Sequence, residues 1–180
     1  MLEKDIEKVL VSTEQIEEIT TKLGKQISED YADRCPIVIG LLKGCVPFMG
    51  NLITKMDIHL ELGFMDVSSY HGGIESSGDI KITKDLEVTV KDRDIIIAED
   101  IVDTGKTLSV IVGLLKYRGA KSVEVVTLLD KPTGRVVEFV PKYIGATIPK
   151  EFVVGYGLDY EEKYRNLPYV GVLKKEVYSK

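Results

Sequence analysis

The residues best suited to chemistry lie between positions 94 and 108, where an apolar run ends in a group of acids and a turn. Glu99, Asp100 and Asp103 follow the run, and a Thr-Gly-Lys-Thr turn at 104–107 then opens a helical pattern. Carboxylates accept hydrogen bonds from hydroxyl groups, and a glycine turn before a helix can direct backbone N–H groups at an anion. The segment therefore suits a ligand that carries both hydroxyls and phosphate, such as a sugar phosphate.

Each part of this segment predicts one kind of contact. Gly105 can adopt a positive φ and the following helix offers its positive end, so residues 103–107 can hold one phosphate, helped by two threonine hydroxyls. Glu99 and Asp100 can accept hydrogen bonds from a ribose diol or hold Mg²⁺. Asp103 lies between these two regions, which is a suitable place for a general base near the anomeric carbon.

Two other nucleotide-binding motifs fail at single positions. A Walker A motif needs a glycine five residues before the glycine of Gly-Lys-Thr, but position 100 is an aspartate. Acids at that place would also repel a triphosphate, which argues against a nucleotide-triphosphate hydrolase. A dinucleotide fingerprint is absent too, because residues 155–160 lack its third glycine.

The composition limits the partners that the chain can have. The 180 residues are 44% hydrophobic and 29% charged, which is ordinary for one globular domain, and the net charge is −5. An acidic chain offers no basic field to recruit a polyanion, so we expect no nucleic-acid partner. A phosphate site must then be local, built from backbone N–H groups and a few cations.

Cysteine usage and the N-terminus indicate the compartment. Cys35 and Cys45 form no C-x-x-C pair and have no metal-ligand spacing with the two histidines, so we expect reduced, mostly buried thiols. The first five residues carry charges where a signal peptide needs an apolar core, and no apolar run approaches the ~20 residues of a membrane span. We expect a cytoplasmic protein without a membrane partner.

The hydrophobic pattern predicts alternating strands and helices. Residues 13–31 have helical spacing, with Ser12 and Gln15 as a capping box, and Gly119 is placed to end a helix over 107–117. A further helix is expected over 47–55. The expected strands, several of them continuous apolar runs, cover 36–42, parts of 59–70, 80–83, 88–90, 94–98, 122–129, 152–156 and 169–173.

This order predicts an α/β fold with a parallel twisted sheet flanked by helices, in a single domain over 1–180. The part after Pro141 breaks the alternation and is expected to form most of a small hood over the carboxyl edge of the sheet, over about 141–180 with N-terminal contributions. Three polar loops follow apolar strands, at 43–44, 99–107 and 130–135. Ligands of open α/β sheets bind at such strand ends, so the three loops should converge on one site.

The segment 99–107 resembles the signature of the type I phosphoribosyltransferases, which bind 5-phosphoribosyl 1-diphosphate. Four further segments, at 42–44, 69–70, 129–132 and 152–160, resemble the hypoxanthine-guanine phosphoribosyltransferases in the same order. The similarity extends from about residue 12 to residue 173. It implies the type I phosphoribosyltransferase fold.

The resemblance also implies roles for residues of the sugar and diphosphate region. Glu99 and Asp100 would approach the ribose hydroxyls and Mg²⁺, and Asp103 would be the base near purine N7. The backbone from Asp103 to Thr107 would hold the 5′-phosphate, with the members Thr104, Gly105 and Lys106 between them. Lys43, Gly44 and Arg165 would contact the diphosphate, with a non-proline cis peptide between Leu42 and Lys43.

For the base, the resemblance implies that Lys131 donates to the 6-oxo group, Phe152 stacks on the ring and Val153 offers its carbonyl oxygen. Asp159 would lie near the purine and a second Mg²⁺. Ser69 and Tyr70 would belong to a lid, and the Gly- and Ser-rich composition of 68–78 is typical of a mobile loop.

The resulting hypothesis is an enzyme of purine salvage, a pentosyl transferase that makes IMP or GMP from a 6-oxopurine and phosphoribosyl diphosphate with Mg²⁺. The family implies a homodimer or homotetramer. The same chemistry with a preference for xanthine stays open. A non-catalytic regulator that senses phosphoribosyl diphosphate is a further alternative, although such a protein would need a nucleic-acid surface.

Overall fold

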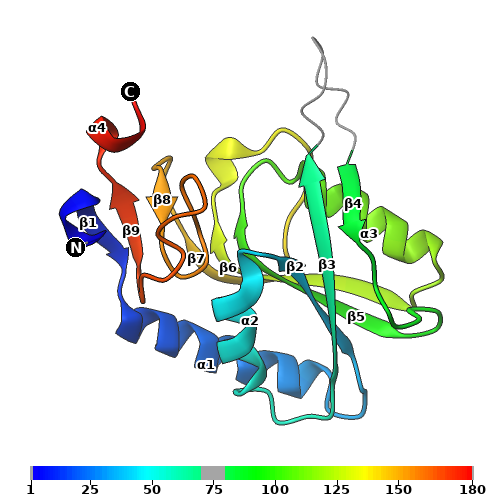
Figure 1. Ribbon diagram of the computed structural model, residues 1–180. Coiled ribbons are helices and arrows are strands. Elements are labelled where there is room, and N and C mark those ends of the chain that lie inside the picture. Colours follow the sequence, from blue (N-terminus) through cyan, green and yellow to red (C-terminus); the bar gives the residue numbers. More distant parts are fainter. Residues whose placement is uncertain (1, 70–79, 180) are drawn as a thin grey trace.

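The computed structural model describes residues 2–69 and 80–179, and its centre is a six-stranded sheet (Figure 1). The strand order is β4-β3-β2-β5-β6-β7, and every neighbouring pair is parallel except β3 with β4. The strands are β2 (Ile37–Leu42), β3 (Glu61–Ser69), β4 (Ile80–Lys84), β5 (Asp94–Val102), β6 (Ser122–Asp130) and β7 (Tyr143–Thr147).

Helices cover both faces of this sheet because its central strands are apolar on both sides. On one face, α1 (Thr13–Asp30) and α2 (Cys45–Ile53) pack on side chains such as Val38 and Ile96. On the other face, α3 (Lys106–Tyr117) packs on Ile37, Ile95 and their neighbours. Successive strand residues thus enter opposite cores, as the period of two requires.

A second, antiparallel sheet of order β1-β9-β8 lies beside the first (Figure 1). It consists of β1 (Ile6–Val11), β8 (Val153–Val154) and β9 (Val170–Leu173). Short helical turns η1 (Leu2–Asp5) and α4 (Lys175–Tyr178) flank it, and η2 (Pro132–Gly134) follows β6. The C-terminal part of this small sheet starts at Val153, because the preceding strand β7 pairs with β6 in the main sheet.

Most of the expected elements are present. The capping box of Ser12 and Gln15 starts α1, and Gly119 follows α3 with a φ of 86°. Two expectations were wrong in their limits: α2 begins at Cys45, before Pro47, and β5 continues through Glu99 to Val102. The expected strand at 88–90 does not form, although Val90 is buried in the core, because this segment packs without a ladder partner among the described residues.

The two cysteines differ in their exposure to solvent. Cys45 is buried as expected, but Cys35 is exposed in the turn before β2, so the expectation of burial was wrong for this thiol. Among the described residues, no helix is long and apolar enough to cross a bilayer.

Candidate active site

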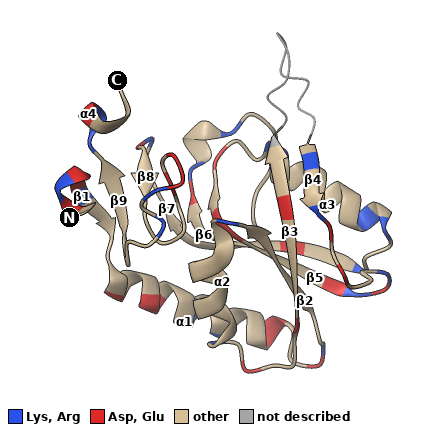
Figure 2. Cartoon of the chain, in the orientation of Figure 1, with Lys and Arg blue, Asp and Glu red and all other residues tan. Residues whose placement is uncertain are grey.

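A cleft of about 770 Å³ lies at the carboxyl ends of β2 and β5, where the loops after these two strands converge; the third expected loop, at 130–135, is not among the lining residues. The coil between β8 and β9 closes its other side and carries acidic and basic residues side by side (Figure 2). The predicted site residues that line the cleft are Gly44, Glu99, Asp100, Asp103, Thr104, Gly105, Thr107, Asp159 and Arg165.

Two adjacent carboxylates form the floor of the cleft. Burial raises the pKa of Glu99 well above its ordinary value, and the neighbouring Asp100 adds to this rise. Burial also raises the pKa of Asp100 to about 6, although this carboxylate accepts a hydrogen bond from Ile101 N at 2.8 Å. Glu99 Oε2 is buried without a hydrogen-bond partner among the described residues. Neither acid forms an ion pair among the described residues, although the charge of Arg165 lowers the pKa of Asp100 to a smaller extent.

Gly44 is required beside these acids. A Cβ atom at this position would overlap the carboxylate of Asp100. The peptide bond between Leu42 and Lys43 is cis, which confirms the expectation from the family resemblance.

The loop after β5 has the geometry of a phosphate site. Gly105 has a φ of 78°, caps α3 and accepts a hydrogen bond from Ser109 N at 2.9 Å. Thr104 accepts a hydrogen bond through its carbonyl oxygen from Val136 N at 3.1 Å, so the segment after β6 holds the loop. The N-terminal end of the 12-residue α3 opens at this place, beside Thr107. Backbone N–H groups and the helix dipole there favour an anion.

Asp103 and Lys131 meet beside this loop. Lys131 Nζ donates to Asp103 Oδ2 at 3.0 Å, and the two side chains are 15% and 42% exposed, respectively. The backbone of Gly134 lies against the same carboxylate, because a Cβ there would overlap Asp103 Oδ1. The structure thus brings the predicted base and the predicted purine ligand into direct contact.

Arg135 is a residue of the site that the sequence analysis missed. Its guanidinium donates to the carbonyl oxygens of Val102 and Asp103 and to Phe139 O, and it forms an ion pair with Asp130. Both side chains of the ion pair are largely buried. Arg135 therefore fastens the end of β5 and the predicted base to the segment that follows β6. In the sequence, the only indication of this role was the position of Arg135, five residues after Asp130 at the end of β6.

This anchoring leads to a stability prediction. We expect Arg135→Ala to lower the free energy of unfolding by about 3–5 kcal/mol, because it leaves Asp130 buried without its partner. Urea denaturation measures this change. Arg118→Ala is a control that removes a bidentate but more exposed pair with Asp85, and should cost at most about 1 kcal/mol. Equal losses in both variants would contradict the anchoring role.

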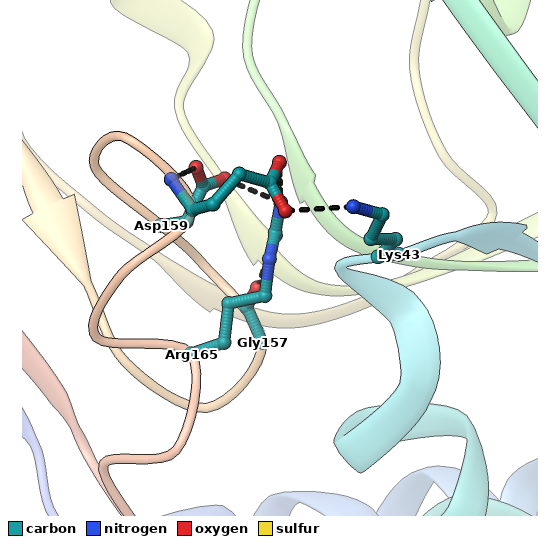
Figure 3. A network of polar contacts seen from close by, with 5 residues as sticks. Lys43, Gly157, Asp159 and Arg165 are labelled. Atoms are coloured by element: carbon teal, nitrogen blue, oxygen red, sulfur yellow. Dashed lines mark hydrogen bonds and ion pairs between the residues drawn. The ribbon is translucent and has the colours of Figure 1, made fainter.

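A polar cluster joins the coil between β8 and β9 to Lys43, which follows β2 (Figure 3). Arg165 donates to Gly157 O at 2.7 Å and pairs with Asp159 at 2.9 Å. Glu162, which the sequence analysis also missed, accepts from Arg165 at 3.0 Å and from Lys43 at 2.7 Å. Two cations thus converge on one carboxylate at the cleft, and Arg165 Nε is buried with no partner among the described residues.

Three of the predicted base ligands, Lys131, Phe152 and Val153, are not among the residues that line the cleft. Phe152 immediately precedes β8 and is 40% exposed, whereas Val153 is buried within that strand. Phe152 stacks on Tyr178 and meets Tyr160 edge to face. Lys106 is exposed on the first turn of α3. The predicted lid falls mostly outside the described residues: Ser69 ends β3, and Tyr70 with the rest of the loop to residue 78 is not described.

No group of three or more His, Cys, Asp or Glu side chains is arranged around a single metal position among residues 2–69 and 80–179. The three predicted metal ligands, Glu99, Asp100 and Asp159, nevertheless line the same cleft. Mg²⁺ usually binds through one or two carboxylates together with waters and substrate phosphates. The acids present fit that mode of binding better than a site built from protein ligands alone.

The fold and the cleft define a class of protein. The family model described as a phosphoribosyl transferase domain matches residues 10–161. A parallel sheet with acids and a phosphate turn at the end of β5 is the arrangement expected from the resemblance to this class.

The relatives narrow the class further. A hypoxanthine-guanine phosphoribosyltransferase of Lactococcus lactis is 59% identical over 179 residues, covering 99% of this chain and 97% of the relative. One of Streptococcus pyogenes is 56% identical over 180 residues, covering 100% of each. A crystal structure of a hypoxanthine phosphoribosyltransferase from Staphylococcus aureus superposes with a TM-score of 0.96 at 51% identity, covering 99% of this chain and 97% of that chain.

The chain belongs to the hypoxanthine-guanine phosphoribosyltransferase family, and its activity is the phosphoribosyl transfer of purine salvage. The fold, the enzyme class and the family expected from the sequence are confirmed. The roles of the individual residues stay predictions.

Proposed function

We propose that the enzyme transfers the 5-phosphoribosyl group of phosphoribosyl diphosphate to hypoxanthine or guanine, giving IMP or GMP. The bond between C1′ and the diphosphate oxygen breaks, a bond from C1′ to a purine ring nitrogen forms, and the purine loses a proton. The observation that carries this proposal is the position of Asp103, between the phosphate turn at Gly105 and Lys131 Nζ at 3.0 Å. A base at this place can reach both the sugar and the purine.

The two ends of the sugar phosphate would bind at different elements. The turn at 104–107 and the N-terminus of α3 hold the 5′-phosphate through backbone N–H groups. Lys43, Gly44 and Arg165 bind the diphosphate, and the carboxylate of Glu162 is its substitute in the free enzyme. The pair of Lys43 with Glu162 is more than half exposed on both sides. Exposed pairs contribute only about 0–1 kcal/mol, so the diphosphate displaces this carboxylate at little cost.

Asp103 would act on the purine during the transfer. The transition state gains positive charge on the sugar and negative charge on the leaving diphosphate, which Arg165 and Lys43 stabilise from their side of the cleft. Asp103 accepts the purine proton or stabilises its transfer. Because Arg135 holds the main chain of Asp103 by hydrogen bonds, the base stays in place while Lys131 exchanges its carboxylate partner for the purine oxygen.

The residues present fit Mg²⁺ as the cofactor. Asp100 is buried and Glu99 is half-buried, neither forms an ion pair among the described residues, and Glu99 Oε2 has no hydrogen-bond partner there. Asp159 lines the same cleft and would serve the second ion. When bound, Mg²⁺ supplies charge neutralisation for the diphosphate. In this proposal, Glu99 and Asp100 also accept hydrogen bonds from the ribose hydroxyls.

Lys131 would select the base. Its ammonium group donates to a 6-oxo acceptor but meets a donor on a 6-amino purine, and Phe152 stacks on the ring while Val153 offers its carbonyl oxygen at the purine edge. An unpaired buried polar group costs about 1–3 kcal/mol, which corresponds to a factor of about 5 to 150. Hypoxanthine and guanine should therefore be good substrates, xanthine weaker and adenine poor.

A spectrophotometric assay with phosphoribosyl diphosphate, Mg²⁺ and each of the four purines tests the proposed function. Lys131→Gln should reduce the preference for hypoxanthine over adenine by at least about tenfold, because the amide can also accept from a 6-amino group. Lys116→Gln is a matched control on the exposed face of α3 and should keep the preference. Turnover of adenine but not hypoxanthine by the unaltered enzyme would overturn the role of Lys131.

The proposal also covers the setting of the enzyme. The whole chain acts as one phosphoribosyltransferase domain in the cytoplasm, assembled as a homodimer or homotetramer. Light scattering coupled to size-exclusion chromatography measures this assembly, and a monomer at micromolar concentration would contradict it.

A further inference from the structure

Two aromatic side chains contact the ring of Phe152. Tyr178 stacks on it with ring centroids 4.7 Å apart and an interplanar angle of 22°. Tyr160 meets the ring edge to face at 5.8 Å and 83°. Phe152 nevertheless remains 40% exposed. Tyr178 therefore covers one face of the ring, while part of the Phe152 side chain stays accessible.

Tyr178 is held in place by packing and by backbone hydrogen bonds. It lies at the end of α4, which follows β9 at the outer margin of the small sheet (Figure 1). Tyr178 and Val177 pack on the apolar cluster of Val154, Tyr164, Leu167 and Leu173. Before α4, Lys174 donates through Nζ to Lys4 O at 2.6 Å and through N to Asp5 O at 2.9 Å. The C-terminal segment is thus fixed on the small sheet, and Tyr178 is not among the residues that line the cleft.

We propose that Tyr178 is a positioning residue of the base subsite: it supports one face of Phe152 so that the other face is presented to the purine. The bound state is then a stack of three rings, in the order Tyr178, Phe152 and purine. This inference rests on the proposed function in one respect, the stacking of the purine on Phe152.

The physical reason is the local anchoring of Phe152. Phe152 immediately precedes a strand of only two residues and is partly exposed, so packing against Tyr178 helps to select one rotamer of its ring. Without Tyr178, the ring would have to be ordered when the base binds, and this cost would weaken binding of the purine. Binding of phosphoribosyl diphosphate at the β5 loop would be unaffected, because Tyr178 makes no contact there.

Steady-state kinetics of Tyr178→Ala and Tyr178→Phe in the full chain test this role. We expect the alanine variant to raise KM for hypoxanthine by about 2- to 12-fold, the range typical of an aromatic pair. The KM for phosphoribosyl diphosphate and kcat should stay within about twofold. The phenylalanine variant keeps the stack without the hydroxyl and should restore the KM of the unaltered enzyme.

Val177→Ala is the matched control, because Val177 packs on the same apolar cluster but is not stacked on Phe152. An equal rise of KM in this variant would mean that Tyr178 only keeps α4 folded, which overturns the proposal. An unchanged KM for hypoxanthine in Tyr178→Ala overturns it as well. A lower KM would overturn it in a different way, because Tyr178 would then compete with the base for Phe152.

Phe152→Ala separates this inference from the proposed function. If Phe152→Ala raises KM for hypoxanthine while Tyr178→Ala does not, only the support by Tyr178 fails. If Phe152→Ala leaves KM for hypoxanthine unchanged, the purine does not stack on Phe152 and the proposed base subsite is wrong.

Discussion

Asp103→Asn should lower kcat by about 10²- to 10⁴-fold, the range that a general base contributes. The amide keeps the size of the side chain and can still accept a hydrogen bond from Lys131, which lies 3.0 Å from the carboxylate. It cannot accept the purine proton. The loss should therefore appear in turnover far more than in binding of the nucleotide, which calorimetry with GMP measures.

The surroundings of Asp103 should keep the side chain in the same position when its carboxylate is replaced by an amide. Its main chain is fastened by Arg135, and Gly134 lies against its carboxylate, so an isosteric amide keeps the local packing. Asp33→Asn changes the same group on an exposed loop and should leave kcat unchanged. If Asp103→Asn turns over near the rate of the unaltered enzyme, Asp103 is not the base.

Removal of divalent metal should abolish turnover. With EDTA in excess, we expect no detectable product, and full activity should return when Mg²⁺ exceeds the chelator. The reason is the charge of the cleft, where Glu99 and Asp100 would face the diphosphate without an intervening cation. Repulsion between these carboxylates and the negatively charged diphosphate would oppose binding of the substrate. It would also oppose the increase of negative charge as the diphosphate leaves.

A second measurement separates a role in the reaction from a role in folding. Because the described residues hold no group of three acidic, histidine or cysteine ligands, the metal should bind mainly together with substrate. The melting temperature of the free enzyme should then be the same with and without EDTA. Full activity in EDTA would contradict the assignment of Glu99 and Asp100 to the metal.

Local patterns were sufficient to predict much of the fold. Helix α1 has both a capping box and a regular apolar stripe, and the central strands are apolar runs between polar turns. The misses have nonlocal causes. Strand β1 has three exposed and two half-buried positions before Val11 and exists because β9 pairs with it. Strand β7 contains Gly145, whose backbone packs against Leu128 O. Its formation depends on pairing with β6 in the main sheet rather than on a local pattern.

The candidate site shows the same division. The acids and the turn of 99–107 could be placed from sequence because they directly follow a strand, and strand ends converge in a parallel sheet. Arg135, Glu162 and Tyr178 could not. Each acts through partners that are distant along the chain or on main-chain carbonyl groups, and neither kind of partner leaves a periodic signal in the sequence.

The pairing of β1 with β9 has a consequence for synthesis on the ribosome. Ile6 pairs with Leu173, so β1 cannot find its partner until the chain has been synthesised as far as β9. The main sheet, complete at Thr147, can form earlier and bring the phosphate turn into shape. The arginine and aromatic residues between 152 and 178 arrive last. A nascent chain can thus form the turn for the 5′-phosphate before Phe152, which we expect to stack on the purine, and Arg165, which we expect to bind the diphosphate, have been made.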